Sequence, residues 1–389
     1  MADGRFDVVV AGGGPAGAVT ACLLTRAGAD VVVLERDGGP RPRVGESLAP
    51  EVEPLLVELG AWTGFRALDP VPSGGTASAW GGPEILRHSH LVTPTGRGWH
   101  VDRGAFDRML RSWASDAGAT VVCGRGVTDV VGGSGGWDVA VRAGSGRGRT
   151  SRVAADVVVD ATGRRALVGR RLGATRRAFD RLVAVASHVP RRAPAEAGAV
   201  LVETAPDGWW YRAPAGRSRD AVVLLTDADV CARMGLSRLP AWSDAVAATR
   251  WIAPSGSAAD PAWGPSTVTA ATHRSDRRGD WRPWLAVGDA ALAVDPIAGS
   301  GIVRALRTGM AGADVVLRLL GAAGDDGHDG RESALVAHER ALDADTTVHL
   351  AERAALYATE RRFDTTFWRR RLAVVGSRPP AAPTIAAAG

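Results

Sequence analysis

Hydrophobic residues near the start of the chain form two short continuous runs on either side of a more mixed segment. The runs are Val8 to Val10 and Val31 to Leu34, and the segment from Ala16 to Ala27 has good helix formers and no proline. Short β-branched runs of this kind are typical of strands buried in a parallel sheet. The pattern therefore predicts a strand, a tight turn, a helix and a second strand.

The turn between the first strand and the helix contains three glycines. Gly12, Gly14 and Gly17 fall on the spacing GxGxxG. In such a turn the first glycine permits the bend, the second lets a pyrophosphate approach the backbone, and the third lets the helix pack closely on the strand. Glu35 ends the second strand about 20 residues later, where an acid accepts hydrogen bonds from a ribose. We therefore predict a dinucleotide site at this turn.

Two later segments repeat the arrangement of an apolar strand followed by glycine and an acid. One strand ends at Gly288 and Asp289, and Gly299 to Gly301 then opens a helix. The free N–H groups at the start of that helix can face an anionic or electron-rich ring edge. In the middle of the chain, the segment VVVDATGRR places Asp160 and Gly163 after a third apolar strand.

These three motifs, GGGPAG, DATG and GDAA followed by DPIAGSG, occur in the order found in a known family. They resemble those of the two-domain FAD-dependent monooxygenases with the aromatic-hydroxylase fold. The resemblance implies an α/β (α+β) protein with a Rossmann-like FAD-binding domain, a mostly antiparallel β-sheet substrate domain and a C-terminal helical segment. Together with the motifs, it implies FAD contacts by Gly12, Gly14, Pro15, Ala16, Gly17, Glu35, Arg36, Arg43, Ser47, Arg103, Val127, Asp160, Gly163, Gly288, Asp289, Pro296, Gly299, Ser300, Gly301 and Ile302.

The resemblance and the strand pattern predict the same division of the chain. The expected strands of the substrate sheet lie in LVAVASHV, AVLVETAPDGWWYRAP and DAVVLLTDAD. A polar linker is expected from Gly321 to Ser333. The predicted parts are an FAD-binding domain of residues 1–75, 104–165 and 276–320, a substrate domain of residues 76–103 and 166–275, a C-terminal helical segment of residues 321–375, and a disordered tail of residues 376–389.

Two further segments narrow the resemblance to a subgroup. RVGESL, which starts at Arg43, resembles the GES segment of flavin-dependent halogenases and their non-halogenating relatives. GWHVDRGAFDRML carries Arg103 where the family has a flavin-contacting arginine, and DGWWYRAP resembles the halogenase motif WxWxIP with Tyr211 and Ala213 as departures. Within this halogenase-like subgroup, the chain is similar to tryptophan-modifying flavoproteins of quinone-cofactor biogenesis.

Two departures from the halogenase pattern argue against halogenation. Tryptophan halogenases use a lysine beside the substrate, whereas all 47 basic residues of this chain are arginines. They also place a glutamate and a serine after the Pro-Leu of the flavin loop, where this chain has Ala298 and Gly299 after Pro296 and Ile297. The flavin-binding motifs are therefore present without the residues that carry halogenation.

The resemblance implies that reduced FAD and O₂ give a flavin 4a-hydroperoxide that hydroxylates an electron-rich aromatic ring. The candidate residues around the substrate are Trp80, His90, Trp209, Trp210 and Tyr211. His90 is the candidate base, although the sequence favours a surface position on a strand for it, and core packing is an alternative for the tryptophans. Because adjacent strand residues point to opposite faces, at most one of Trp209 and Trp210 is expected to line the pocket. His100, Glu46 and His273 are weaker candidates for the base.

The substrate is expected to be an indole or phenol group, either a free small molecule or linked to a peptide or carrier in a biosynthetic pathway. With no second nucleotide motif in the chain, electrons come either from NAD(P)H directly or from a partner flavin reductase. Two alternatives remain. One is a flavin-dependent dehydrogenase or reductase similar to geranylgeranyl reductases, and the other is a non-catalytic flavin-binding protein.

Composition limits the other partners of the protein. The net charge is +5, but the arginines are scattered and no nucleic-acid motif accompanies them. No apolar run approaches the roughly 18 residues of a membrane span, so a cytoplasmic protein that binds no membrane is expected. Cys22, Cys123 and Cys231 are widely separated and show no metal-ligand spacing, and no metal site is predicted.

Overall fold

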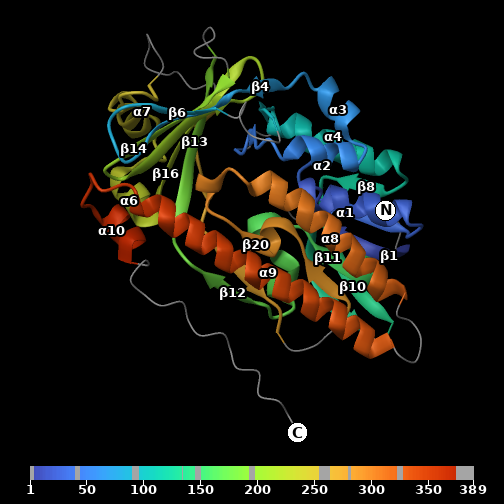
Figure 1. The fold of residues 1–389 in the computed structure, drawn as a ribbon. Helices are drawn as coiled ribbons and strands as arrows, with labels where there is room; N and C mark the ends of the chain where they lie inside the picture. The colour runs from blue at the N-terminus through green and yellow to red at the C-terminus, as the bar shows by residue number, and fades with distance from the viewer. Residues whose placement is uncertain are drawn as a thin grey trace.

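Two large sheets and the helices packed on them make up the described part of the protein. The computed structural model describes residues 4–39, 44–89, 96–133, 135–144, 150–191, 198–253, 263–278, 282–321 and 327–373. In Figure 1 one sheet lies towards the upper left and the other towards the right, and the long helix α9 (Gly327–Ala358) runs along both. This helix therefore connects the two halves of the molecule.

The first sheet contains the strands that lead into the three glycine-containing motifs. Its order is β8-β2-β1-β11-β10-β9, and β19 also pairs with β11. Ala11 at the end of β1 lies opposite Asp160 of β11, which lies opposite Ala286 of β19, so the three parallel strands end level with one another. The strands are β1 (Gly4–Ala11), β2 (Val31–Glu35), β8 (Thr120–Cys123), β9 (Arg125–Gly133), β10 (Gly136–Ala143), β11 (Thr150–Asp160) and β19 (Trp284–Ala286).

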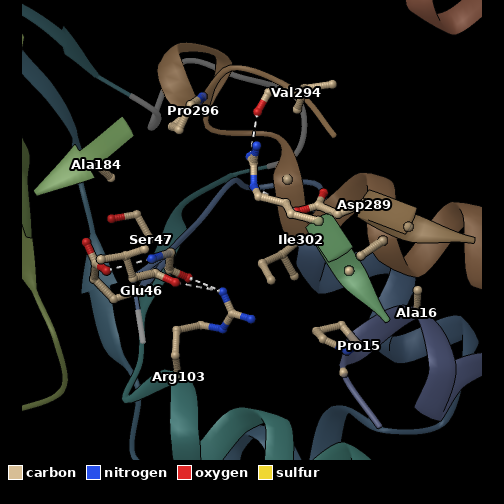
Figure 2. Close-up of a pocket in the computed structure, with 18 of the residues that line it drawn as sticks. Pro15, Ala16, Glu46, Ser47, Arg103, Ala184, Asp289, Val294, Pro296 and Ile302 are labelled. Atoms are coloured by element: carbon tan, nitrogen blue, oxygen red, sulfur yellow. Dashed lines mark hydrogen bonds and ion pairs between the residues drawn. The ribbon is translucent and has the colours of Figure 1, made fainter. Parts of the chain in front are cut away.

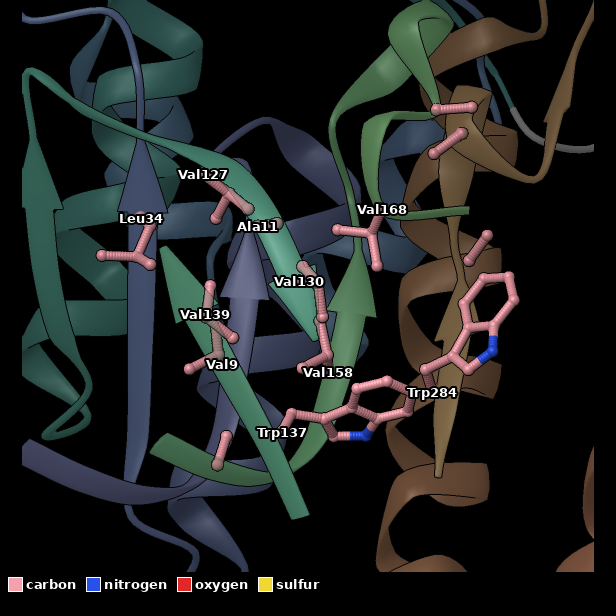
Figure 3. Packing of buried hydrophobic residues seen from close by; sticks show 14 of the residues in the cluster. Val9, Ala11, Leu34, Val127, Val130, Trp137, Val139, Val158, Val168 and Trp284 are labelled. Carbon is pink, nitrogen blue, oxygen red and sulfur yellow. The ribbon is translucent and has the colours of Figure 1, made fainter. Parts of the chain in front are cut away.

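Alternate residues of β1 pack on opposite faces of this sheet. Val8 and Val10 join the cluster that includes α1 (Pro15–Arg26) and α8 (Gly301–Gly321), while Val9 and Ala11 join the cluster on the other face. Figure 3 shows this second cluster, in which the rings of Trp137 and Trp284 close one end. Burial on both faces explains why the strand has no polar alternation.

The second sheet is mostly antiparallel. Its order is β17-β13-β16-β15-β14-β5-β6, and only the pair of β14 with β5 is parallel among these neighbours. The strands are β5 (Gly75–Ala79), β6 (Leu86–Ser89), β13 (Leu182–Pro190), β14 (Val200–Ala205), β15 (Gly208–Pro214), β16 (Arg219–Asp227) and β17 (Trp263–Thr269).

The two faces of the second sheet pack against different helices. Trp209 and Leu225 belong to a cluster with residues of α9 and α10 (Thr366–Ala373). Trp210 and Leu224 belong to the opposite cluster, which includes residues of α6 (Ala228–Met234) and α7 (Leu239–Ala247). The sheet therefore separates a side that faces the rest of the molecule from a side that is closed by its own helices.

Two three-stranded sheets and several short helices complete the fold. One sheet has the order β3-β7-β4 and the other β12-β18-β20. The elements are β3 (Ser47–Leu48), β4 (Val71–Ser73), β7 (Gly98–His100), β12 (Thr175–Ala178), β18 (His273–Asp276), β20 (Leu292–Ala293), α2 (Val52–Glu58), α3 (Trp62–Ala67), α4 (Arg103–Asp116), α5 (Leu167–Arg171) and the 3₁₀ turns η2 (Gly163–Arg165), η4 (Gly288–Ala290) and η5 (Pro296–Ala298).

The predicted fold class is confirmed: strands and helices form a mixed α/β structure with a mostly antiparallel second sheet and C-terminal helices. The predicted linker was wrong from Gly327 onward, because α9 begins there, with Asp329 in its first turn, where a negative charge stabilises a helix. The tail predicted for residues 376–389 lies outside the described residues. The division of the chain into domains stays a prediction.

Two features are absent from the described residues. None of the helices combines the length and apolar character needed to cross a lipid bilayer. No group of three or more His, Cys, Asp or Glu side chains is arranged to hold a metal ion.

A short chain of buried hydrogen bonds joins α9 to the second sheet. The Tyr357 hydroxyl donates to Oδ2 of Asp295 at 3.0 Å and accepts from Nε1 of Trp209 at 2.9 Å. Tyr357 is 1 % exposed and Asp295 is equally buried, so these groups have no water to replace a lost partner. The hydroxyl therefore links α9, β15 and the loop before η5.

Replacing Tyr357 by phenylalanine is expected to destabilise the protein without changing its fold. The change leaves an oxygen of Asp295 and the N–H of Trp209 buried without this partner, which costs about 1–3 kcal/mol. Urea denaturation followed by circular dichroism measures the loss. Thr347→Ala is the control, because that hydroxyl is exposed on the same helix and donates only to the Asp343 carbonyl oxygen. Equal stabilities of the two variants would contradict this role of Tyr357.

Candidate functional site

One cavity of about 730 Å³ extends between the two large sheets and is lined by residues from all three glycine-containing motifs. The level ends of β1, β11 and β19 bring these motifs to the same edge of the first sheet. The carboxyl ends of parallel strands are where ligands bind in open α/β sheets. In Figure 2 Pro15, Ala16, Asp289 and Ile302 lie on one side of this cavity, and Glu46 and Ser47 lie across from them.

Two of the three glycines in the turn after β1 are required by close backbone contacts, and the other borders open space. A Cβ on Gly12, which has φ +109°, would lie 2.2 Å from the carbonyl oxygen of Ala161, and a Cβ on Gly17 would lie 2.0 Å from the Gly12 oxygen. A Cβ on Gly14 would meet no protein atom within 4 Å, although Gly14 lines the cavity. The first and third glycines are therefore required by protein packing, while the second leaves space that a ligand would occupy.

Glu35 is held in place by the backbone around it. Its Oε2 accepts a hydrogen bond from the Gly13 N–H at 2.7 Å, and its Oε1 accepts one from the Asp37 N–H at 2.9 Å. The residue is 7 % exposed and lines the cavity. A carboxylate has about four acceptor positions, so capacity remains for ribose hydroxyls.

Arg103 reaches the cavity from the start of α4. Asp102 caps this helix by accepting from the Ala105 N–H at 2.8 Å. The Nη1 of Arg103 donates to the carbonyl oxygens of Val44 and Gly45, both at 3.1 Å, as Figure 2 shows for this side of the cavity. Its Nε is buried and has no hydrogen-bond partner, which fits a ligand that supplies an acceptor there.

Asp289 forms an ion pair that the sequence did not suggest. Its Oδ2 lies 3.3 Å from Nε of Arg164, and Arg164 also donates to the carbonyl oxygens of Ala271 and Val294, both at 2.8 Å. Arg164 follows Gly163 in the DATG segment, so it connects the middle and late motifs. The ion pair holds Asp289 at the edge of the cavity, where the resemblance places the ribityl chain of FAD.

The loop before α8 continues the same wall. The turn η5 is capped by Asp295, whose Oδ1 accepts from the Ile297 N–H at 3.0 Å, and Gly299 follows with φ +61°. Gly299, Gly301 and Ile302 line the cavity. The start of α8 therefore borders the space in which the resemblance places the flavin ring.

The second sheet supplies an apolar wall. Trp209 and Tyr211 of β15 line the cavity together with Ala184, Val202, Val223 and Leu225. Trp210, between them, points to the opposite cluster, where its ring centroid lies 6.4 Å from that of Trp242. Trp80 packs in the aromatic cluster with Trp209, Tyr357 and Trp368, and its Nε1 donates to the Leu356 carbonyl oxygen at 3.2 Å.

The structure brings most of the predicted site residues to the cavity. Those that line it are Gly12, Gly14, Pro15, Ala16, Glu35, Arg36, Ser47, Arg103, Val127, Gly163, Gly288, Asp289, Pro296, Gly299, Gly301, Ile302, Trp209 and Tyr211. Gly17, Asp160, Ser300, Trp80 and Trp210 lie in the structure but not in this lining. Arg43 and His90 lie outside the described residues. The roles of all these residues stay predictions.

Asp160 is placed beneath the turn rather than in the cavity. Its Oδ1 accepts from the N–H of Thr162 at 3.0 Å and from its hydroxyl at 2.6 Å, and its Oδ2 accepts from the Gly169 N–H at 2.9 Å. The carboxyl is fully buried, and burial raises its pKa. Asp160 therefore organises the DATG turn, while Gly163 in the same turn reaches the cavity.

The weaker candidates for a base occupy very different surroundings. His100 is fully buried between Oγ of Ser47 at 3.0 Å and the Gly198 carbonyl oxygen at 2.6 Å. Burial and the neighbouring Arg176 lower the pKa of His273 to about 4. Neither histidine lines the cavity, whereas Glu46 does. Of these three weaker candidates, Glu46 is thus the one that reaches the described cavity lining.

Comparison with known proteins agrees with the cavity. Residues 5–340 match the family described as FAD binding domain. The chain is 38% identical over 193 residues to a Pseudomonas fluorescens chlorinase of pyrrole-2-carbonyl groups on a peptidyl-carrier protein, a match that covers 44% of this chain and 42% of the chlorinase. It is 29% identical over 300 residues to the putative FAD-dependent oxidoreductase LodB of Marinomonas mediterranea, which covers 76% of this chain and 80% of LodB.

A solved structure is similar over nearly the whole chain. The peptidyl tryptophan dihydroxylase QhpG, described as essential for tryptophylquinone cofactor biogenesis, superposes with a TM-score of 0.75 at 25% identity. The match covers 94% of this chain and 78% of QhpG.

Replacing Gly14 by valine is expected to weaken FAD binding by about tenfold or more, because a side chain at Gly14 would take space beside the glycine turn. Gly14 has φ −75° and ψ −176°, which any residue can adopt, so the fold is expected to persist. FAD absorbance of the gel-filtered protein measures binding, and circular dichroism checks the fold.

The matched control for this variant is Gly264→Val. Gly264 lies in β17, is exposed, and a Cβ there also meets no atom within 4 Å. Full FAD content in both variants would contradict the placement of the pyrophosphate at Gly14.

Proposed function

Because the chain belongs to the FAD binding domain family and is an FAD-dependent oxidoreductase, we propose that it is a monooxygenase that hydroxylates an indole or phenol group. The observation that carries this proposal is the cavity of about 730 Å³ between the two large sheets. One wall carries the three glycine-containing motifs, and the facing wall is the apolar side of the second sheet with Trp209 and Tyr211. An apolar ring can therefore lie beside the site expected for the flavin.

The residues present fit FAD. The open space beside Gly14 suits a pyrophosphate, Glu35 suits a ribose, and the unpartnered Nε of Arg103 suits an acceptor atom of the cofactor. Bound FAD, once reduced, would supply the O₂ activation that the protein side chains cannot provide. The apolar wall would exclude water and orient the ring against the start of α8.

Two relatives support a substrate that is attached to a larger molecule. QhpG is described as acting on peptidyl tryptophan, and the chlorinase as acting on a pyrrole group on a carrier protein. We infer that this protein takes an aromatic group linked to a peptide or carrier in a biosynthetic pathway, and that electrons reach FAD from NAD(P)H or from a partner flavin reductase.

Halogenation is a second candidate, because the chlorinase is 38% identical over the part of the chain that it matches. Against it, the chain lacks the lysine of tryptophan halogenases, and Ala298 and Gly299 stand where those enzymes have a glutamate and a serine. Hydroxylation needs neither of these groups. We therefore favour oxygen transfer over halide oxidation.

Mass spectrometry of the products separates these reactions. Protein loaded with FAD is supplied with NADH, a flavin reductase, ¹⁸O₂ and bromide, with indole- and phenol-bearing peptides as probes. The expected result is one ¹⁸O atom per product and no bromine isotope pattern. A brominated product would support the halogenase alternative, and a loss of two hydrogens without oxygen would support the dehydrogenase alternative. FAD reoxidation without any product would support a non-catalytic protein.

The two adjacent tryptophans of β15 give a matched pair of variants. Trp209→Phe is expected to lower kcat/KM about two- to tenfold, because a ring contact in the cavity is worth about 0.5–1.5 kcal/mol. Trp210→Phe is the control, since it also trims a buried indole but on the opposite face of the sheet. Both should keep full FAD content. Equal effects of the two substitutions would mean that Trp209 contributes only to core packing.

A further inference from the structure

A buried carboxyl group lies in the lining of the cavity, opposite the glycine-containing motifs. Glu46 is 1 % exposed and precedes β3, and its backbone oxygen accepts from the Val101 N–H at 3.0 Å, which fixes its position. Figure 2 shows Glu46 and Ser47 on the side of the cavity away from Asp289 and Ile302. Lys, Glu, Arg and Asp are almost never fully buried unless they are paired, so this position needs an explanation.

The hydrogen bonds of Glu46 leave one oxygen available. Its Oε2 accepts from the Gly45 N–H at 2.8 Å, whereas its Oε1 is buried without a hydrogen-bond partner. A buried acceptor without a partner costs free energy, and a ligand that donates a hydrogen bond there would recover it. The carboxyl is therefore suited to contact a donor group on a molecule in the cavity.

The groups around Glu46 set its protonation. Burial raises the pKa of the Glu46 carboxyl to about 7, and the Gly45 backbone, the Tyr211 hydroxyl on β15 and the Arg103 guanidinium on α4 offset only part of this rise. Burial and the neighbouring Glu46 in turn raise the pKa of Tyr211. A carboxyl group with a pKa near neutrality can both accept and release a proton at physiological pH.

We propose that Glu46 is a catalytic base, whose Oε1 accepts the proton of the substrate's phenol O–H or indole N–H while the ring is hydroxylated. The O–H or N–H bond of the substrate breaks, its electron pair stays in the ring and makes the ring carbon more nucleophilic, and the proton forms a new O–H bond with Oε1. The Tyr211 hydroxyl acts as a positioning group beside the carboxylate. This inference rests on the proposed function.

The other polar groups of this wall are poorer proton acceptors. Arg103 is a guanidinium, which carries only donors and has no acceptor. The hydroxyls of Ser47 and Tyr211 are weak bases near neutral pH. Among the described residues around Trp209 and Tyr211, the carboxylate of Glu46 is therefore the group best suited to take a proton.

The first test is the pH dependence of kcat/KM for hydroxylation of a phenol-bearing peptide. In the unmodified protein kcat/KM should fall below about pH 7, because Glu46 becomes protonated and can no longer accept a proton. Glu46→Gln should lower kcat/KM by about 10²- to 10⁴-fold and remove this decrease below pH 7, which we call the acidic limb of the pH profile. The Tyr211 hydroxyl stabilises the charged carboxylate and lowers the pKa of Glu46. Tyr211→Phe removes this hydroxyl and should therefore move the acidic limb to higher pH. Glu51→Gln is the control, since Glu51 lies on the same segment but outside the cavity lining.

The second test needs no turnover. The acidic phenol 4-nitrophenol absorbs at different wavelengths as phenol and phenolate, so its bound form is visible in a titration of the FAD-loaded protein. At pH 7 the Glu46 carboxylate, which accepts the phenol O–H and repels the phenolate, should lower the phenolate fraction of the bound probe in the unmodified protein and in Glu51→Gln relative to Glu46→Gln. The FAD content and the melting temperature of each variant show whether the cavity is intact.

Both tests separate the inference from the proposed function. If the unmodified protein incorporates no oxygen, the proposed function fails, and an equal phenolate fraction in all variants then overturns the assignment of Glu46 as well. If oxygen is incorporated but Glu46→Gln keeps the same acidic limb and the same phenolate fraction, only the assignment of Glu46 fails. If Glu46→Gln does not bind FAD, an unchanged acidic limb of the pH profile in Tyr211→Phe would overturn the assignment of Glu46.

Discussion

The rest of the structure depends on close backbone contacts at the point where β1, α1 and β11 meet. These contacts leave no room for side chains. The Gly12 backbone lies against the Ala161 carbonyl group and Gly17 against Gly12, both closer than any Cβ allows. The same device recurs between α8 and its neighbours, because a Cβ on Gly309 would lie 2.7 Å from the Ala16 oxygen and one on Gly312 would lie 2.5 Å from Cγ1 of Val287. Close packing of α1, α8, β11 and β19 follows, and it aligns the three motifs at one edge of the sheet.

The far side of the cavity depends on the second sheet and on α9. Trp209, Tyr357 and Asp295 are joined by hydrogen bonds of 2.9 and 3.0 Å, so the apolar wall, the long helix and the loop before η5 are held in one arrangement. Because that loop leads into the start of α8, the contact relates the wall of the second sheet to the site expected for the flavin. The geometry of the cavity thus depends on residues far apart in the sequence.

The sequence was informative where structure is local and less so where it depends on packing. Short apolar strands and glycine spacing predicted the arrangement around Gly12 and Gly17, because close backbone contact demands glycine whatever the rest of the chain does. Residues 327–333 were expected to be a linker because they are polar and contain glycine, but they form the first turns of α9, whose residues from Ala334 onward were expected to be helical. Asp160 and Asp289 look alike as acids after apolar strands, but only the folded structure shows that the first is enclosed by Thr162 and Gly169.

The absence of lysine from the chain limits the acid–base chemistry of the cavity. Every cationic side chain in its described lining is an arginine, and a guanidinium does not exchange protons near neutral pH. The described lining also contains no histidine, and burial lowers the pKa of His273 away from it. The carboxyl groups of the described lining are therefore the better proton acceptors. Of these, Glu35 accepts from two backbone N–H groups, Asp37 pairs with Arg36 and Asp289 pairs with Arg164. Glu46 combines an oxygen without a hydrogen-bond partner and a pKa raised to about 7, which is why the proposed proton transfer is assigned to it.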